Sequence, residues 1–212
     1  MHTPVTRDLV QLAITATLEC PGEAPGGVTW DGSHFWVLDE AGETLYCLDR
    51  QTGGVHAEAP AEGAGGGTAW DGTWLYQSAP GQYRILVIDP AAGRVVRRIP
   101  TRVKASGLAW DGTHLWHGSF SEKRTYLVDA ELGDVRGTID SPVAGGGLVW
   151  DGRQFWCCDA GAIYRVDSEG AVLGAYAVDG APRHLAWAER RLWFTCARDR
   201  RLKRVAVDML QS

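Results

Sequence analysis

The chain of 212 residues carries 21 Lys and Arg against 26 Asp and Glu, a formal net charge of −5 at pH 7. This acidic balance lacks the cationic surface that a phosphate backbone requires, so nucleic acid is excluded as an expected partner. Residues are 45% hydrophobic and 22% charged, which excludes a disordered chain and is ordinary for a globular protein.

The first segment with the pattern of a secondary-structure element covers residues 9–18, LVQLAITATL. Its apolar run is interrupted by Gln11, Thr15 and Thr17, and it lacks the cationic flank and the cleavage site of a signal peptide. It is therefore predicted to form a β-strand. No segment approaches the roughly 18 apolar residues needed to cross a bilayer, so no membrane insertion is expected.

A seven-residue motif then recurs along the chain. It reads WDGSHFW at 30–36, WDGTWLY at 70–76, WDGTHLW at 110–116, WDGRQFW at 150–156 and, in degenerate form, WAERRLW at 187–193. The first four copies are spaced by 40 residues, and the last follows after 37. A fixed period of this size is typical of stacked or radially arranged supersecondary units.

Each unit has the pattern of four short strands. In residues 105–139, apolar runs of four to seven residues alternate with turn residues. The Asp-Gly pair after the first Trp predicts a tight type I′ hairpin, because Gly carries no steric penalty at positive φ. A second Asp, such as Asp129, is expected to accept hydrogen bonds from turn amides after the third strand, with Gly133 in the left-handed conformation.

A meander of this kind is apolar on both faces and cannot bury itself alone. Radial packing of successive sheets solves this problem, which predicts an all-β fold, a five-bladed β-propeller. The fifth unit stops one strand short, so the N-terminal strand at 9–18 is expected to complete the last blade. The chain is then a single domain, residues 1–212. Its blades are expected at about 24–63, 64–103, 104–143, 144–180 and 181–208.

The tryptophans and glycines have structural interpretations in such a ring. Trp110 and Trp116 are expected to fill the wedge between neighbouring blades, in preference to forming an aromatic ligand cage. Glycines precede the inner strands of four blades, as in Gly65-Gly66-Gly67, and let the strands approach a narrow axis. The alternative interpretation is a ring of exposed backbone N–H groups that holds an anion or water.

The five cysteines are odd in number and follow no C-x-x-C spacing, so neither a disulfide framework nor a zinc site is predicted. Buried free thiols are favoured over redox or metal chemistry. Such thiols fit a reducing compartment, so a cytoplasmic location is expected.

Polar residues are expected to gather at the top face, the end of the ring where the inner strands begin. No Ser/His/Asp order, phosphate loop or metal motif is present, so no catalytic residue, metal or cofactor is predicted. The candidate binding residues lie at the ends of second strands or in top-face loops. They are Asp39, Lys104, His117, Phe120, Arg124, Asp159, Arg183 and His184.

The repeat also carries a resemblance. The pattern W-D-G-x-x-[LF]-W, together with I-D-P-x-x-G-x-V-V at 88–96, resembles bacterial propellers of the glutaminyl-peptide cyclotransferase-like and quinoprotein-like superfamilies, including the virginiamycin B lyase group. The resemblance covers residues 9–208 and implies the fold. Cyclotransferases carry an F-T-[QE]-G-L element before an inner strand. No blade of this chain keeps the acidic or amide residue of that element. The residues at or near the corresponding positions are Ser106, Gly26, Gly66, Gly146 and Arg183.

The leading functional prediction is a non-catalytic binding module, a rigid ring that presents its top face and loops to a protein, peptide or small ligand. One alternative is an enzyme of cyclotransferase or lyase type, with His117 as base and Asp39 or Asp159 as acid or metal ligand. Another is a structural subunit of a larger assembly, marked by an exposed aromatic such as Tyr83 or Phe120 at a loop tip.

Overall fold

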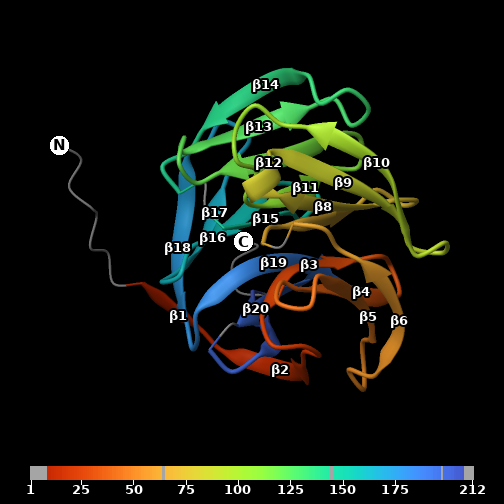
Figure 1. Cartoon of the computed structure of the whole chain (residues 1–212). Coiled ribbons are helices and arrows are strands. Elements are labelled where there is room, and N and C mark those ends of the chain that lie inside the picture. The colour runs from red at the N-terminus through yellow and green to blue at the C-terminus, as the bar shows by residue number, and fades with distance from the viewer. Residues whose placement is uncertain (1–8, 64, 144–145, 197, 208–212) are drawn as a thin grey trace.

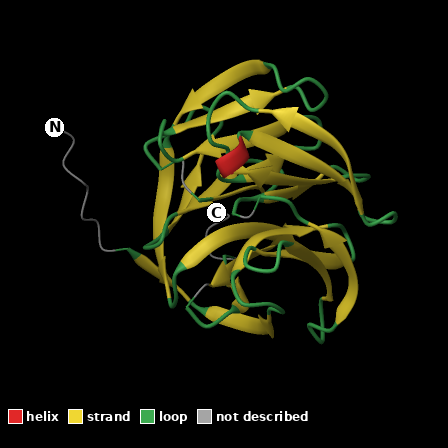
Figure 2. Cartoon of the chain, in the orientation of Figure 1, coloured by secondary structure: helices red, strands yellow, loops and turns green. Residues whose placement is uncertain are grey.

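The computed structural model of the chain describes residues 9–63, 65–143, 146–196 and 198–207. These residues form 21 strands and one short 3-10 helix, η1 (Pro80–Gln82). The strands make five sheets arranged around an axis (Figure 1), and the ribbon is almost entirely strand and loop (Figure 2). The predicted five-bladed β-propeller is confirmed. No helix among the described residues has the length and apolar character of a membrane span.

Each blade runs from an inner to an outer strand. Blade 1 contains β3 (Pro25–Trp30), β4 (His34–Asp39), β5 (Thr44–Asp49) and β6 (Val55–Pro60); blade 2 contains β7 (Thr68–Trp70), β8 (Leu75–Ala79), β9 (Arg84–Asp89) and β10 (Arg94–Pro100). Blade 3 contains β11 (Leu108–Trp110), β12 (Leu115–Ser119), β13 (Arg124–Val128) and β14 (Val135–Asp140); blade 4 contains β15 (Gly147–Trp150), β16 (Phe155–Cys158), β17 (Ile163–Val166) and β18 (Val172–Val178). Blade 5 contains β19 (Pro182–Ala188), β20 (Arg191–Cys196) and β21 (Arg201–Val205).

The N-terminal segment closes the ring. As predicted, β2 (Ile14–Glu19) pairs antiparallel with β21 and completes blade 5, which Figure 1 shows as a red strand beside the blue C-terminal ones. The segment is not one strand, however, because β1 (Val10–Leu12) pairs in parallel with β18 and gives blade 4 a fifth strand. This arrangement carries Leu12 into a buried cluster between blades 4 and 5. The N-terminus therefore joins two neighbouring blades.

The Asp-Gly turns correct one prediction. In blade 1, Asp31 has an ordinary negative φ and only Gly32 is positive, at 100°. A Gly at the first central position is the pattern of a type II′ turn, not type I′. The Asp31 carboxylate instead accepts the backbone N–H groups of Ser33 and His34, each at 2.7 Å, and the indole N–H of Trp36 at 2.9 Å. Asp therefore suits this position because of the hydrogen bonds that its side chain accepts, and not because of its backbone conformation.

The same bonding recurs around the ring. Asp111 and Asp151 accept the indole N–H groups of Trp116 and Trp156, each at 2.7 Å, and Asp71 accepts the hydroxyl of a Tyr. A buried indole N–H without a partner costs about 1–3 kcal/mol, so the repeated Asp stabilises the aromatic that follows it. Blade 5 lacks this Asp. Its turn has positive φ at Glu189 (50°) and Arg190 (61°), and is the one Trp-motif turn of type I′.

The turn after each third strand follows the prediction. Asp129 accepts the N–H groups of Glu131 and Leu132, each at 2.9 Å, and Gly133 has φ of 78°. Equivalent bonds are made by Asp49, Asp89 and Asp167. These turns and the Trp-motif turns form the bottom face of the ring, opposite the top face.

Aromatic side chains fill the wedges between blades, as predicted. Trp110 of blade 3 stacks on Tyr76 of blade 2, with ring centroids 6.2 Å apart and an interplanar angle of 7°. Trp116 meets Phe155 of blade 4 edge to face at 5.3 Å. The buried apolar residues fall into five clusters, and each joins adjacent blades. The core is thus divided among the interfaces and absent from the axis.

All five cysteines are buried, as predicted, and none forms a disulfide. Burial raises the pKa of Cys158 to about 12 and, with the charge of Glu19 as the next cause, that of Cys20 to about 12. Both are therefore thiols near neutral pH and are poor nucleophiles.

Glycines hold the inner strands together at the top. A methyl group on Gly67 would lie 2.7 Å from the Gly107 Cα, and one on Gly107 would lie 2.7 Å from the Leu148 N. Gly27 and Gly147 make equally close approaches to the next inner strand. These contacts confirm the steric explanation of the glycine repeat. The amide of Gly67 also donates to the Ser106 carbonyl at 2.6 Å, so it is not free to bind an anion.

Candidate functional site

The two predicted carboxylates organise loops. Asp39 is buried, and it accepts the N–H groups of Glu23, Ala24 and Gly42 at 2.8–3.2 Å. This bonding fixes the approach to β3 against the loop after β4, and burial separates the carboxylate from a ligand in solvent.

Asp159 has the same role in blade 4. It accepts the N–H groups of Gly161 and Ala162 at 2.8 and 3.0 Å, and the hydroxyl of Tyr164 at 3.0 Å. Burial, followed by the hydrogen bond to Asp159, raises the pKa of Tyr164 to about 12. The tyrosine is thus a donor at neutral pH, and the turn is held by three bonds to one side chain.

Arg183 takes part in an ion pair between the last and first blades. Its guanidinium donates to both carboxylate oxygens of Glu40, at 3.0 and 2.9 Å. A methyl on Gly26 would lie 2.5 Å from Glu40 Oε1, so this carboxylate stands directly over the start of β3. The Arg183 side chain is 37% exposed and the Glu40 side chain is 15% exposed. The pair links the blades where the ring closes.

Small polar side chains complete the top of the ring, and the sequence reasoning missed them. Near the end of the second strand, Thr195 Oγ1 donates to the Gly26 carbonyl of blade 1 at 2.7 Å, and Ser78 Oγ donates to Ser106 at 3.1 Å. Cys158 Sγ makes the equivalent contact with the Arg183 carbonyl at 3.3 Å. These side chains recur at a spacing of about 40 residues, which is the signal that the sequence offers for them. The residue types differ between blades, so the repeat is not evident from the sequence.

The two predicted histidines are buried and neutral. His117 is 1% exposed and stacks on Tyr126, with ring centroids 4.9 Å apart. His184 is 6% exposed and stands where the other four blades have a glycine. Burial lowers the pKa of His117 to about 4, and burial with the charge of Arg183 lowers that of His184 to about 3. Their Nδ1 atoms have no hydrogen-bond partner among the described residues.

We expect the free energy of unfolding to fall as pH decreases from 6.5 to about 4. In this pH window His117 binds a proton in the unfolded state but not in the folded state, so protonation stabilises the unfolded state relative to the folded one. The difference between the ordinary pKa of 6.5 and the folded value of about 4 corresponds to a loss of about 3 kcal/mol below pH 4. Urea unfolding at a series of pH values measures this slope.

His117→Gln is the matched variant, because Gln77 occupies the equivalent position in blade 2. We expect a shallower pH dependence for this variant, with the remaining slope carried by His184. Parallel curves for the variant and the wild type would show that His117 is protonated equally in both states. His114→Gln, at an exposed histidine, is the control.

Three predicted residues lie at the outer part of the top face. Phe120, 56% exposed, follows β12, and the ammonium of Lys123 lies 4.0 Å from its ring centroid. Arg124 donates to Asp140 at 2.5 Å across the β13–β14 pair. Lys104 is exposed. The structure therefore brings Arg183 together with Glu40, but it does not gather the eight predicted residues into one site.

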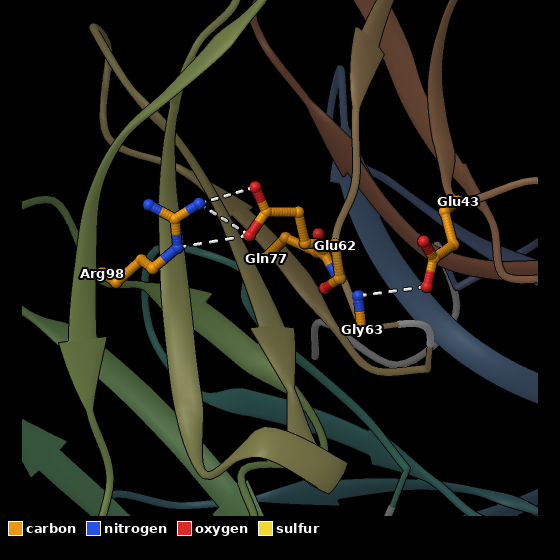
Figure 3. A network of polar contacts seen from close by, with 5 residues as sticks. All are labelled: Glu43, Glu62, Gly63, Gln77 and Arg98. Atoms are coloured by element: carbon orange, nitrogen blue, oxygen red, sulfur yellow. Dashed lines mark hydrogen bonds and ion pairs between the residues drawn. The ribbon is translucent and has the colours of Figure 1, made fainter.

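A further polar network ties blades 1 and 2 together (Figure 3). The carboxylate of Glu62, in the loop between β6 and β7, accepts three hydrogen bonds from the Nε and Nη2 atoms of Arg98. The Glu62 carbonyl accepts the Gln77 amide at 3.4 Å. The next residue, Gly63, donates to Glu43 at 3.2 Å. The Arg98 and Glu62 side chains are 45% and 42% exposed, so solvent screens their attraction and the pair adds little to stability. It positions a loop and is not a buried charge.

Two cavities bear on function. The axial channel is lined by all five inner strands, including the Trp30 and Trp187 positions, and holds about 90 Å³. A second cleft of about 260 Å³ lies between blades 5 and 1, beside Trp193 and Arg204. Small-molecule sites usually measure about 300–1,000 Å³. The channel is therefore a space for a few waters, and the cleft lies just below the range of ligand pockets.

No protein-family model matches the sequence, and no curated protein matches it. Among solved structures, the fold is similar to glutaminyl cyclase from Myxococcus xanthus, with a TM-score of 0.78, 14% identity, and coverage of 94% of this chain and 98% of that one. BamB from Moraxella catarrhalis gives a TM-score of 0.51 at 13% identity, covering 92% and 99%. A chain of a mitotic checkpoint complex has a TM-score of 0.53 and 16% identity, and the match covers 92% of this chain and 68% of that one.

These likenesses agree with the resemblance read from the repeat motifs, since both glutaminyl cyclase and BamB are β-propellers. At identities of 13–16% they show the fold alone. This chain is a five-bladed β-propeller, and its fold is similar to that of the bacterial cyclase.

Proposed function

We propose that this chain is a non-catalytic binding module that holds a protein partner on the top-face loops of blades 2 and 3. The observation that carries the proposal is a pair of exposed aromatic side chains. Tyr83, 48% exposed, lies in the loop between β8 and β9, and Phe120, 56% exposed, lies in the corresponding loop of the next blade. Exposed aromatics on a rigid scaffold are the usual anchors of protein interfaces.

The loops around these aromatics are well organised. Tyr83 follows η1 and has a left-handed conformation, with φ of 51°, and its carbonyl accepts the Thr101 N–H at 2.8 Å. The Phe120 N–H donates to Ser106 Oγ at 3.3 Å. A loop that is already ordered loses little conformational entropy on binding, which favours affinity.

The chemistry of the top face supports binding over catalysis. A general base must reach the proton that it removes, and the imidazole of His117 is buried with a pKa of about 4. The carboxylates of Asp39 and Asp159 each accept three hydrogen bonds, from neighbouring loops and, for Asp159, also from Tyr164 on β17. A propeller of similar fold belongs to a mitotic checkpoint complex, so the architecture serves in protein assemblies.

Affinity capture from a lysate of the native cells tests the proposal. Wild-type protein is compared with the double variant Tyr83→Ala, Phe120→Ala. We expect a partner recovered at stoichiometric yield with the wild type to fall by about 30-fold or more with the variant, because loss of a hot-spot aromatic costs about 2 kcal/mol or more.

Leu132→Ala is the matched control. Leu132 is 64% exposed, but it lies in the bottom-face turn between β13 and β14. Partner recovery with this control should equal that of the wild type. Equal recovery with all three proteins would refute binding at the top-face loops, and unfolding in urea confirms that each variant is folded.

A further inference from the structure

Three side chains of different metal-ligating types converge on the bottom rim of blade 1. Asp31 lies in the turn before β4, His34 begins β4, and Cys47 lies on β5. The ligand atoms of these residues all lie within 4.8 Å of one another, and Asp31 Oδ2 is 3.8 Å from His34 Nδ1. The carboxylate and imidazole are partly exposed, at 16% and 31%, so an ion could enter from solvent.

A second imidazole adjoins this cluster. His56 stacks on His34 with ring centroids 4.9 Å apart and an interplanar angle of 6°. Its position results from a β-bulge: Cys47 pairs with Ala57 and the following Leu48 pairs with Val55, so His56 is the extra residue. The bulge therefore brings a fourth potential ligand, His56, beside the cluster of Asp31, His34 and Cys47.

The repeat shows that these residues are not required by the turn itself. Blade 3 has the same Asp-His pair, with Asp111 Oδ2 3.2 Å from His114 Nδ1. In blade 3, however, Leu127 pairs with Trp116 as Cys47 pairs with Trp36, and Arg136 stands at the bulge. The turn forms in both blades. The thiol and the second imidazole are additions specific to blade 1.

We propose that Asp31, His34, Cys47 and His56 bind one zinc ion. Zn²⁺ takes four ligands from thiolate, imidazole and carboxylate groups, with bonds of about 2.0–2.3 Å. Tetrahedral geometry then places ligand atoms about 3.5 Å apart, and the ligand atoms of Asp31, His34 and Cys47 already lie within 4.8 Å of one another. His56 turns out of its stack on His34 to direct a ring nitrogen at the same ion. Trp36 donates to Asp31 Oδ2 at 2.9 Å and orients that ligand, as outer partners do at metal sites.

Binding must convert the Cys47 thiol to a thiolate and release its proton to solvent. Burial, followed by the charge of Asp31, raises the pKa of Cys47 to about 11, so the free protein holds the proton and the metal displaces it. The bound ion would join the turn, the middle strand β5 and the outer strand β6. It would therefore act as a structural clip of blade 1, separate from the top-face loops of blades 2 and 3.

Cobalt titration tests the site, because Co²⁺ substitutes for zinc and is coloured. The chelator-treated protein should bind one equivalent of Co²⁺, with visible bands of a tetrahedral ion and the charge-transfer band of a Co–thiolate bond. Added Zn²⁺ should displace the colour. Cys47→Ser should lose the charge-transfer band, and His34→Ala and His56→Ala should each weaken binding at least about tenfold.

His114→Ala is the control, since it removes the equivalent imidazole of blade 3. This variant should bind Co²⁺ as the wild type does. Because Cys47 is buried, its substitution could disturb blade 1. The variants of His34, which is partly exposed, and of His56, which is exposed, provide a second test that leaves the core intact. Absence of the thiolate band in the wild type, or unchanged affinity in both His34→Ala and His56→Ala, would overturn the proposal.

Discussion

Deletion of residues 1–20 is expected to abolish the closed ring and to lower the free energy of unfolding by about 4 kcal/mol or more. The deletion removes β2, whose Ala16 and Leu18 pack on the cluster between blades 5 and 1, together with the buried Cys20. Ile14 packs on the neighbouring cluster. Each of these four side chains contributes about 1 kcal/mol when partly or fully buried, and the backbone bonds to β21 are lost as well.

The deletion also exposes β21 as a new edge strand. Leu202 and Val205 are fully buried in the intact ring, and the unpaired backbone of an exposed edge strand can pair with strands from other molecules. We therefore expect oligomers or aggregates in size-exclusion chromatography, together with a lower urea midpoint. A peptide of residues 9–20, added in trans, should restore the monomer by supplying the missing strand.

Deletion of residues 1–12 is the matched control. It removes β1 and the burial of Leu12, but it retains β2 and the closure of blade 5. Loss of one buried Leu corresponds to about 2 kcal/mol, and the protein should remain a monomer. Equal midpoints for the full chain and the 1–20 deletion would contradict the closure role of β2.

Gly67→Val is expected to destabilise the ring by at least about 3 kcal/mol, the upper part of the range for overpacked sites. A Cβ at this position would lie closest to the Leu108 N, and it would lie 2.7 Å from the Gly107 Cα and 2.8 Å from the Gly107 carbonyl carbon, all backbone atoms of blade 3. Backbone cannot rotate away as a long side chain can, so relief requires movement of a whole blade. That movement would open the interface where Trp110 stacks on Tyr76.

Gly81→Ala is the control for this substitution. A methyl group at Gly81 meets no atom within 4 Å, and its φ lies outside the left-handed range. The variant should stay within about 0.5 kcal/mol of the wild type in urea unfolding. A Gly67→Val protein as stable as Gly81→Ala would show that the blades are not held in contact at the axis.

The candidate site was less accessible to sequence reasoning than the fold. Asp39 and Asp159 were correctly placed at the ends of second strands, whereas His117 lies buried in the middle of β12. The chemistry of all three depends on contacts that no spacing reveals. Two of them bond to turn amides, and burial lowers the pKa of the third. Burial and hydrogen bonding determine whether a polar group is available to a ligand, and both are properties of the packed chain.

The turn chemistry shows the same division within one motif. The sequence correctly marked a hairpin at Asp31-Gly32, but type I′ geometry was wrong there and occurs instead at Glu189-Arg190. The Asp carboxylate reaches an indole five residues later, and this bond decides the conformation. Propensity describes a residue in isolation, whereas the turn type follows from what its side chain contacts.

The sequence by itself determined the architecture, because a 40-residue period, alternating apolar strands and a surplus N-terminal strand are local patterns that permit one economical packing. Only the tertiary structure decided that segment 9–18 divides between blades 4 and 5. It alone brought His56 to Asp31, His34 and Cys47, through a bulge and a strand register. Register and burial arise from contacts between residues far apart in the chain, and periodicity along the chain does not encode them.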